Sequence, residues 1–592
     1  MKNVVVYSNL YFMRLNIQRQ LGRLLVVNGY LPKILLAALI GVVTGFVAIA
    51  FHETLSFVTY WVRYPWTGEA SLPYWTFMVI PPLGGLICGI LIHVLTKTPE
   101  AAGQGTDNMI YAFHHQGGRV RKRVAPVKFL SSIITLGSGG SAGYEGPISQ
   151  IGSGIASSIC SLFKMPRSLR GQFSLAGTAA GLGAIFKAPL AGALTSVEVL
   201  YKEDFEAGAF ATSIVAAVIS FTVYTAWIGI EPMFPGVPNF NFVNAKELFF
   251  CALLGIFCVP FSLLYVWSYN ETEKRFSRSN MPSILKPALG GLFVGILFIA
   301  YPEIAGGGFG FIGDLMQDKQ TVAGLGVLTL AAIAIAKIVG TAFTVGSGGS
   351  GGVFGPALFI GALVGASFAG IIALLFPGVL REPEAMILIG MGAFFAGSSK
   401  ASIAGVVMVC EMTGSYSLLP GLLIASVMHV ALSRRWTIYK SQVKNKFASP
   451  VHRAEMDPDV LRVITVGEVM IKAPIHILQA NDVLSTVKPF MDSKHTFPVY
   501  DQEKYIGLLE MNSARYNLIT APTLSEQILV SDCVVKVPLL NRSLDLHSAM
   551  RLFLRLGNTD FYVKNKEGAI VGLLSHSSIL KAYDNTVSQK KN

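Results

Sequence analysis

The sequence has few charged residues and no cysteine pattern typical of a metal site. Only 14% of its 592 residues are charged, whereas 52% are hydrophobic, and the mean hydropathy is +0.54. A soluble domain needs a more polar surface, so this composition excludes an ordinary soluble protein and indicates the lipid bilayer as the solvent. The six cysteines show no metal-ligand spacing, and most lie in apolar stretches where a free thiol packs as a small hydrophobe. We therefore expect neither disulfides nor a metal ion.

Two common catalytic signatures are also missing. The sequence contains no His-Glu-x-x-His pair and no P-loop, so neither metal-assisted hydrolysis nor phosphate binding by such a loop is predicted. An enzyme acting in the membrane is therefore not expected.

Six uncharged apolar runs are long enough to cross about 30 Å of hydrocarbon as helices. They are residues 34–51, 75–95, 207–230, 248–270, 357–380 and 412–433. These runs predict an integral, multi-pass protein of the cell's inner or plasma membrane. The basic stretch before them, residues 1–32, lacks a small-residue cleavage pattern, so we expect a retained cytoplasmic segment and no removable signal peptide.

Positive charge is in excess and lies beside apolar segments. The net charge is +13, with basic clusters at residues 119–123 and 440–446. Lys and Arg are enriched on the cytoplasmic loops of membrane proteins, which explains the clusters without nucleic acid. We expect a lipid environment, cytoplasmic N- and C-termini and no nucleic-acid partner.

The membrane region contains an internal repeat. Gly137-Ser-Gly-Gly-Ser-Ala-Gly-Tyr-Glu-Gly-Pro147 recurs 209 positions later as Gly346-Ser-Gly-Gly-Ser-Gly-Gly-Val-Phe-Gly-Pro356. Downstream, Lys187-Ala-Pro-Leu-Ala-Gly192 and Glu198 correspond to Lys400-Ala-Ser-Ile-Ala-Gly405 and Glu411. Membrane repeats of this kind are often inverted and place a substrate site at their interface, where interrupted helices end. We expect two homologous halves, at about residues 33–230 and 247–440.

The Gly-rich loops predict an anion site. Each loop is followed by Gly-Pro and an apolar run, which is typical of a helix start. Free N–H groups and the positive end of the helix dipole bind an anion without a full positive charge. Small residues also serve close helix packing in membranes, but two copies of the same pattern favour a pathway.

Glu145 is the only charged residue between Lys128 and Lys164. A carboxylate at a helix start within the membrane is costly and usually marks a functional site. Being anionic, it can occupy the anion site itself and leave when it is protonated or displaced, which predicts a gate. The alternative is a residue that only complements the helix dipole.

With these motifs the sequence resembles the CLC family of chloride channels and transporters over residues 33–440. The family's Gly-x-Glu-Gly-Pro motif appears as Gly143–Pro147, and its Gly-x-Phe-x-Pro motif as Gly352–Pro356. The resemblance implies a homodimer in which each subunit has its own pathway for chloride or a similar small anion.

The resemblance also implies roles for particular residues. Glu145 would be the gating glutamate, backbone amides of Val353 and Phe354 would contact the central anion, and the Tyr439 hydroxyl would bind that anion from the inside. The residues expected at the anion site are Gln104, Gly143, Tyr144, Gly146, Val353, Phe354 and Tyr439.

Two departures from the family pattern concern the anion itself. Gln104 stands where the family usually has a serine, and its amide offers both a donor and an acceptor, so the choice between chloride and nitrate stays open. Tyr144 replaces the arginine that is common before the gating glutamate, which lowers the positive potential near the outer entrance.

A third departure concerns protons. Proton-coupled members commonly carry two adjacent glutamates, the second of which passes protons from the cytoplasm, whereas this sequence has Glu198 followed by Val199. Valine cannot carry a proton. We therefore predict a passive, glutamate-gated chloride channel, with a proton-coupled anion exchanger as the alternative.

After about Tyr439 the sequence becomes more polar, and a helix-like segment, a short strand and a Gly-Leu-Leu strand end occur twice, at residues 483–509 and 544–574. This repeat resembles a pair of CBS modules at residues 464–592, joined by a linker at 441–463. Ser513 and Ser578 stand where the family usually has an aspartate that holds a nucleotide ribose. We expect a packing module and no cofactor, with an adenine nucleotide as the alternative.

The predicted fold is therefore an all-α polytopic membrane domain, made of two inverted-repeat halves with broken helices, followed by a cytoplasmic α/β CBS-pair domain.

Overall fold

The computed structural model describes residues 30–67, 78–234, 245–317, 319–452, 458–472, 476–490, 496–511, 514–515, 526–556, 560–565 and 567–589. The chain divides into two compact units, Met1–Val451 and His452–Asn592. The predicted N-terminal segment, residues 1–32, lies almost wholly outside the described residues, and so does Ser513.

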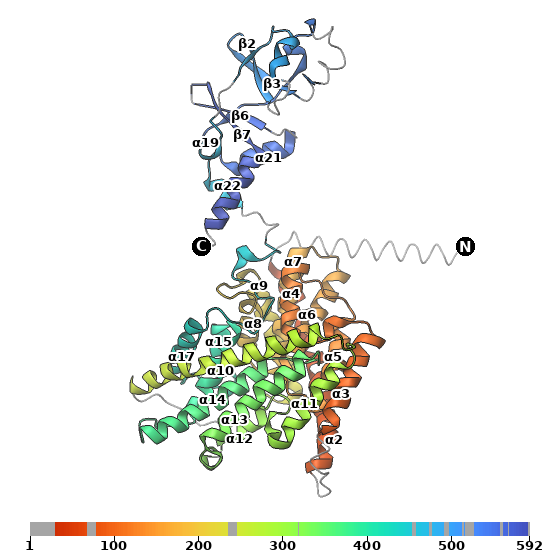
Figure 1. Ribbon diagram of the computed structural model, residues 1–592, viewed down its shortest axis with the longest axis vertical. Helices are drawn as coiled ribbons and strands as arrows, with labels where there is room; N and C mark the ends of the chain where they lie inside the picture. Colours follow the sequence, from red (N-terminus) through yellow and green to blue (C-terminus); the bar gives the residue numbers. More distant parts are fainter. Residues whose placement is uncertain are drawn as a thin grey trace, which may run out of the picture. The chain divides into compact units, whose positions relative to one another are not determined.

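The first unit is a bundle of helices that differ widely in length and tilt (Figure 1). They are α2 (Tyr30–Thr67), α3 (Ile80–Ile90), α4 (Gly105–Gln116), α5 (Val124–Gly137), α6 (Glu145–Leu162), α7 (Arg167–Ile185), α8 (Pro189–Glu198), α9 (Ala207–Ile228), α10 (Ala245–Arg278), α11 (Lys286–Ala300), α12 (Phe309–Gln317), α13 (Lys319–Gly346), α14 (Phe354–Leu375), α15 (Ala385–Ser399), α16 (Ser402–Thr413) and α17 (Leu419–Leu432). Five stretches of described helix are long and apolar enough to cross a membrane, and several other apolar helices are shorter. The mostly helical membrane fold is confirmed.

One predicted span is wrong as a continuous helix. The apolar run at 412–433 is divided between α16 and α17. Gly414 has a left-handed backbone (φ 69°) that closes α16, and Pro420 lies in the first turn of α17. Hydropathy alone cannot see this break, because the residues around it are uncharged.

The two halves contain matching helices. α5 ends at Gly137 and α13 at Gly346, while α6 begins at Glu145 and α14 at Phe354. Both pairs therefore follow the 209-residue offset of the sequence repeat. In each half, a helix ends at the Gly-rich loop and the next helix begins directly after it.

The halves also bind each other through reciprocal helix caps. The Glu198 carboxylate accepts hydrogen bonds from Ile403 N (3.1 Å) and Ala404 N (2.8 Å) at the start of α16. The Glu411 carboxylate accepts from Leu190 N (3.2 Å) and Ala191 N (2.8 Å) at the start of α8. A contact that is unchanged when the halves are exchanged indicates a pseudo-two-fold relation. Each carboxylate satisfies amide groups that a helix start leaves without intrahelical partners.

The second unit contains strands and short helices. Its elements are α18 (Pro458–Val463), α19 (Val466–Val469), β1 (Leu478–Gln479), β2 (Thr496–Asp501), β3 (Lys504–Glu510), β4 (Val534–Val535), β5 (Leu540–Asn541), α21 (Leu546–Leu556), β6 (Asp560–Lys564), β7 (Ile570–Ser575) and α22 (His576–Gln589). They form a four-stranded sheet, β1-β2-β3-β4, and a three-stranded sheet, β5-β6-β7.

The two sheets repeat one topology. In each, a short first strand pairs in parallel with the second, and the second pairs antiparallel with the third. The register shifts at Val499/Tyr500 in one sheet and at Val563/Lys564 in the other. An α/β C-terminal region with an internal repeat is thus present.

Candidate functional site

The two Gly-rich loops meet in an antiparallel bridge between the halves. Gly143 N donates to Gly352 O (2.9 Å), and Gly352 N donates to Gly143 O (2.8 Å). The starts of α6 and α14 are thereby brought together. The Gly143 amide is engaged in this bridge, so it is the first-turn amides beyond it that can face a bound ion.

Glycine is required here because backbone meets backbone. A Cβ atom on Gly105 would lie 2.1 Å from Gly146 O, and one on Gly146 would lie 2.8 Å from Gly352 Cα. One on Gly352 would lie 2.7 Å from Gly146 N. The α4, α6 and α14 starts can therefore converge only where these three positions carry no side chain.

We expect Gly146→Ala to destabilise the site severely. The added methyl group meets backbone atoms that cannot rotate away, and overpacking of a tight core costs about 1–3 kcal/mol or more. Anion flux in liposomes and the melting temperature in detergent should both fall. Gly313→Ala is the matched control, because a Cβ atom there meets nothing within 4 Å; equal effects of the two changes would contradict the close approach.

Glu145 is fully buried and reaches from its own half to the other. Its Oε2 accepts a hydrogen bond from Gly355 N (3.1 Å), in the first turn of α14. Its Oε1 has no hydrogen-bond partner among the described residues. The negatively charged oxygens thus lie where amide groups of α14 present a positive potential, which is the place a permeant anion would take.

Phe354 stands at the equivalent position of the second half and packs in an aromatic row. Its ring centroid lies 5.1 Å from that of Phe186 and 4.0 Å from that of Phe395. One side of the site is therefore apolar, and strengthens the interaction of any charge with the amide groups.

Tyr439, near the C-terminal end of the membrane unit, is buried. Its hydroxyl has no hydrogen-bond partner among the described residues. Thr106 lies beside that hydroxyl. Gln104 is nearby, because its Nε2 donates to Ile438 O (3.2 Å). Its Oε1 is buried without a partner within the described chain. Gln104 and Tyr439 thus bring uncommitted polar atoms together at the start of α4.

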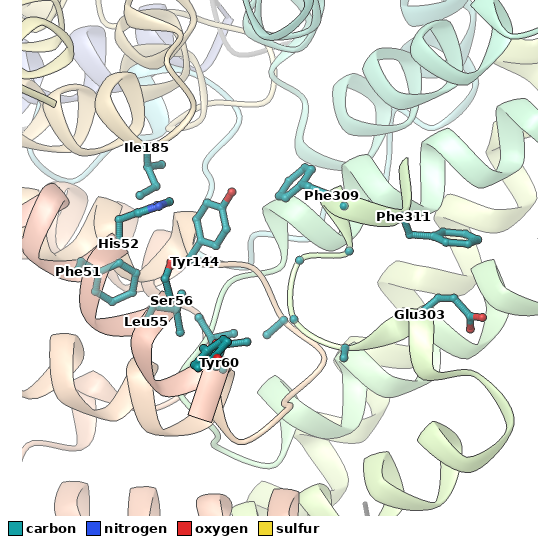
Figure 2. Close-up of a pocket in the computed structure, with 18 of the residues that line it drawn as sticks. Phe51, His52, Leu55, Ser56, Tyr60, Tyr144, Ile185, Glu303, Phe309 and Phe311 are labelled. Carbon is teal, nitrogen blue, oxygen red and sulfur yellow. The ribbon is translucent and has the colours of Figure 1, made fainter. Parts of the chain in front are cut away.

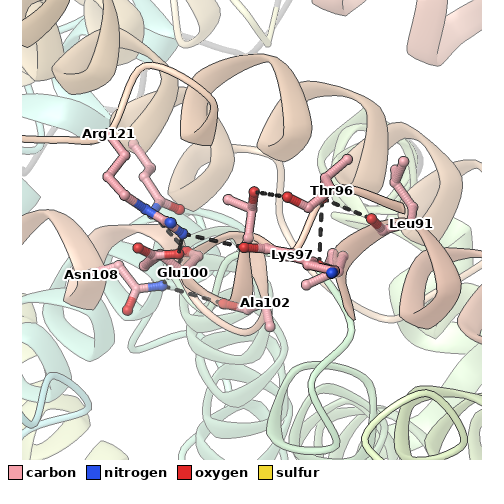
Figure 3. A network of polar contacts seen from close by, with 10 residues as sticks. Leu91, Thr96, Lys97, Glu100, Ala102, Asn108 and Arg121 are labelled. Carbon is pink, nitrogen blue, oxygen red and sulfur yellow. Dashed lines mark hydrogen bonds and ion pairs between the residues drawn. The ribbon is translucent and has the colours of Figure 1, made fainter. Parts of the chain in front are cut away.

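The Gln104 loop is held by a polar network (Figure 3). Asn108 Nδ2 donates to Glu100 O (3.0 Å) and Ala102 O (3.2 Å). Arg121 forms an ion pair with the Glu100 carboxylate. The loop therefore has a fixed backbone, although Arg121 and Glu100 are half-exposed.

Two buried lysines were missed in the sequence, although they stand at equivalent positions of the repeat. Lys128 Nζ donates to Ala101 O (3.1 Å) and Gly103 O (2.7 Å). Lys337 Nζ donates to Ile304 O (2.8 Å) and to Gly306 O. Both side chains are fully buried. Their separation of 209 residues, each within an apolar run, was the signal that could have found them.

Tyr265 of α10 was also missed. Its hydroxyl donates to Val353 O (2.7 Å). Because the C=O and N–H of one planar peptide point in opposite directions, this bond fixes the orientation of the Phe354 N–H. Nothing in the sequence around Tyr265 distinguishes it from other aromatic residues of α10.

A cavity of about 580 Å³ lies beside the Glu145 loop. Figure 2 shows Phe51, His52, Ser56 and Tyr60 of α2 on one side, with Tyr144 and Phe309 turned toward each other across it. The centroids of the Tyr144 and Phe309 rings are 5.9 Å apart. Tyr144 thus lines this cavity, and its role at the anion site stays a prediction.

Val199 lies at the C-terminal end of α8. It is buried, and its carbonyl accepts a hydrogen bond from Gln442 Nε2 (3.0 Å).

A family model described as "Voltage gated chloride channel" matches residues 84–434, more than half of the chain. The chain belongs to the CLC family. It is therefore an integral, multi-pass membrane protein of chloride transport, and not an enzyme.

Similar proteins of the CLC family are named both as channels and as exchangers. "H(+)/Cl(-) exchange transporter ClcA" of Citrobacter koseri is 32% identical over 410 residues, covering 67% of this chain and 84% of that protein. "Chloride channel protein CLC-f" of Arabidopsis thaliana is 32% identical over 410 residues, covering 65% of this chain. The match spans about half, 52%, of the Arabidopsis protein.

Solved CLC structures share the fold. A "slow cyanobacterial Cl-/H+ antiporter" aligns with a TM-score of 0.60 at 24% identity, covering 69% of this chain and 96% of that one. A "CLC-type fluoride/proton antiporter" aligns with a TM-score of 0.59 at 20% identity, covering 71% and 100%. At these identities the likeness establishes the fold alone. Among the curated relatives, the ClcA proteins carry the name of exchange transporters, which agrees better with the alternative prediction, an exchanger, than with the passive channel.

Proposed function

We propose that this protein exchanges chloride for protons across the membrane, with Glu145 as the group that both gates the anion path and carries the proton. The observation that carries the proposal is the Glu145 carboxylate at the start of α14, with one oxygen on Gly355 N and the other without a described partner. An ionised carboxylate there competes with an anion, and a protonated one does not. Relatives named as H(+)/Cl(-) exchange transporters support the same reading.

The remaining site residues take supporting roles in this proposal. The first-turn amides at Val353 and Phe354, with the Gly146 start of α6, attract the anion through the helix dipoles. The Tyr439 hydroxyl donates a hydrogen bond to the anion from the side opposite Glu145. Gln104 gives up its hydrogen bond to Ile438 O and turns its amide toward the ion. The site therefore selects ions that bind this amide more strongly than Ile438 O does.

A passive channel is the second candidate, and Val199 favours it. Exchange requires a titratable route to Glu145 from the side opposite the outer entrance, and the valine side chain cannot supply one. If the protein is a channel, protonation of Glu145 changes only how often the path is open.

The reversal potential distinguishes the two candidates. We expect purified protein in liposomes, under a fixed chloride gradient, to reverse at a voltage that shifts when a pH gradient is imposed, because exchange ties the two ion movements together. The measurement is a voltage-clamped reversal potential at several pH gradients. A reversal potential that stays at the chloride Nernst potential in every pH gradient assigns the protein to the channels.

Further parts of the proposal concern assembly and orientation. We propose a homodimer with one pathway per subunit, in the inner or plasma membrane, with both termini cytoplasmic. Exposed apolar side chains on α8, α9, α16 and α17 offer a surface for a second copy or for lipid: Leu190, Val218, Ile403, Leu423 and Val427.

The C-terminal unit is proposed to be a CBS pair, supported by its two sheets of equal topology. Ser578 bonds within its own turn, since its N–H donates to Ser575 Oγ (3.1 Å). With serine in place of the ribose-binding aspartate, the pair is proposed to pack and to contact a second copy rather than to hold an adenine nucleotide.

A further inference from the structure

The turn between α8 and α9 contains a buried carboxylate that the anion site does not use. Three acidic residues lie in this turn. Glu203 pairs with Arg434 and is half-exposed, and Asp204 accepts the Lys446 amide (2.9 Å). Glu206, in contrast, is only 7% exposed. A buried carboxylate at the edge of a membrane domain is costly and usually has a function.

Glu206 is hydrogen-bonded to Tyr201, which follows Val199 by two residues. The Tyr201 hydroxyl donates to Glu206 Oε2 (2.7 Å), and Tyr201 is fully buried. The Glu206 amide is bonded to Val197 O (3.1 Å), so the carboxylate is anchored to the C-terminal end of α8 itself. The titratable pair thus lies directly beside the position where the sequence lacks a titratable side chain.

The network continues beyond Tyr201. The Ser449 side chain lies beside the Tyr201 hydroxyl. Ser449 Oγ is 2.7 Å from His114 Nδ1, and His114 Nε2 is 3.0 Å from Leu200 O. Glu206, Tyr201, Ser449 and His114 therefore form a connected, buried set of groups able to accept or pass a proton.

Charged groups around Glu206 connect it to the basic end of the membrane unit. Lys446 Nζ lies 3.9 Å from Glu206 Oε1 and is partly exposed. The backbone of residues 443 and 444 is bonded to the turn, through Lys202 N to Val443 O (2.9 Å) and Glu203 N to Lys444 O (3.1 Å). Gln172 Nε2 of α7 and Glu206 Oε1 both lie next to Gly208, within 4 Å of the position that a Cβ atom there would take. Since residues 440–446 form one of the basic clusters expected on the cytoplasmic side, Glu206 lies between that side and Val199.

We propose that Glu206, with Tyr201, is the place where cytoplasmic protons enter the membrane unit on their way to Glu145, in place of a titratable side chain at position 199. The inference rests on the proposed proton-coupled exchange. The Glu206 carboxylate takes a proton from cytoplasmic water and becomes neutral. Once Glu206 is neutral, the Tyr201 hydroxyl turns away from it and gives its proton to a water molecule, which becomes hydronium, while the Tyr201 oxygen takes the carboxyl proton of Glu206. Glu206 is then ionised again and Tyr201 neutral again. Water molecules carry the proton onward to Glu145.

Glu206→Gln is the decisive variant, because glutamine still offers an oxygen to the Tyr201 hydroxyl but cannot take up a proton. In liposomes we expect chloride flux to persist while proton transport falls at least about tenfold, with the reversal potential moving to the chloride Nernst potential. Asp204→Asn, in the same turn, is the matched control and should keep the coupling.

Tyr201→Phe provides an independent arm, since it removes only the relaying hydroxyl and should also reduce proton transport more than chloride flux. If wild-type protein responds to the pH gradient and both Glu206→Gln and Tyr201→Phe respond equally, the inference is overturned and the proposed exchange stands. If wild-type protein ignores the pH gradient, the proposed exchange is overturned and this inference with it. Equal loss of both fluxes in folded Glu206→Gln protein assigns the network a structural role and also overturns the inference.

Discussion

Glu145→Ala is expected to abolish proton coupling while chloride flux persists. The carboxylate is buried, and it bonds Gly355 N in the first turn of α14. Alanine leaves the amide groups free to bind a permeant anion, and it removes the carboxylate that titrates there. In liposomes, the pH dependence of flux should disappear and the reversal potential should equal the chloride Nernst potential at every pH gradient.

Glu271→Ala is the control for this change, because Glu271 is a carboxylate of α10 that pairs on the surface with Arg275 (2.9 Å). It should leave coupling and pH dependence as in the wild type. Retention of the wild-type pH dependence by folded Glu145→Ala protein would remove Glu145 from both the gating and the coupling account.

Lys337→Met should reduce anion flux about tenfold or more, or prevent folding, because the lysine is a buried cation in the membrane unit. Methionine fills a similar volume but leaves Ile304 O and Gly306 O without their donor. Each orphaned buried carbonyl costs about 1–3 kcal/mol. The change also removes the positive charge nearest the Gly306 to Phe309 segment that lines the cavity in Figure 2.

Lys128, at the equivalent position of the repeat, provides the control for Lys337. Lys128→Met removes the equivalent pair of hydrogen bonds, to Ala101 O and Gly103 O, on the Gln104 side. We expect the melting temperature in detergent to fall in both variants, and the anion affinity to change more in Lys128→Met because Gln104 follows Gly103 directly. Arginine at either position keeps the charge and should recover part of the flux. Wild-type stability and flux in both methionine variants would show that the lysines are dispensable.

Much of the membrane unit could be predicted from local sequence. The Gly-rich motifs and their 209-residue offset predicted two helix starts, and the structure begins α6 and α14 at the expected residues, Glu145 and Phe354. Those starts depend on local chemistry, on Gly-Pro in the first turn and an apolar run behind it. Glu145 stood out as a charge in an uncharged stretch for the same local reason.

The supporting residues could not be predicted in the same way. Tyr265 bonds Val353 across 88 residues, and Glu206 is important only because Tyr201 folds back onto it beside Val199. The break between α16 and α17 was missed because hydropathy averages over the Gly414 turn. Each of these depends on which surfaces pack together, and a single sequence does not state that.

The sequence alone predicts a membrane protein whose membrane unit is repeated, with a site at two Gly-rich helix starts and at the one charge of an uncharged stretch, Glu145. The bond between Gly143 and Gly352, the reach of Glu145 to Gly355, and the bond from Gln104 to Ile438, the neighbour of Tyr439, are visible only in the folded structure. Composition and repeats can be recognised in the linear sequence without knowledge of the fold. Residues more than 200 positions apart come into contact because two backbones can pack closely only where glycine has no side chain. Which glycines meet depends on how the whole helix bundle packs.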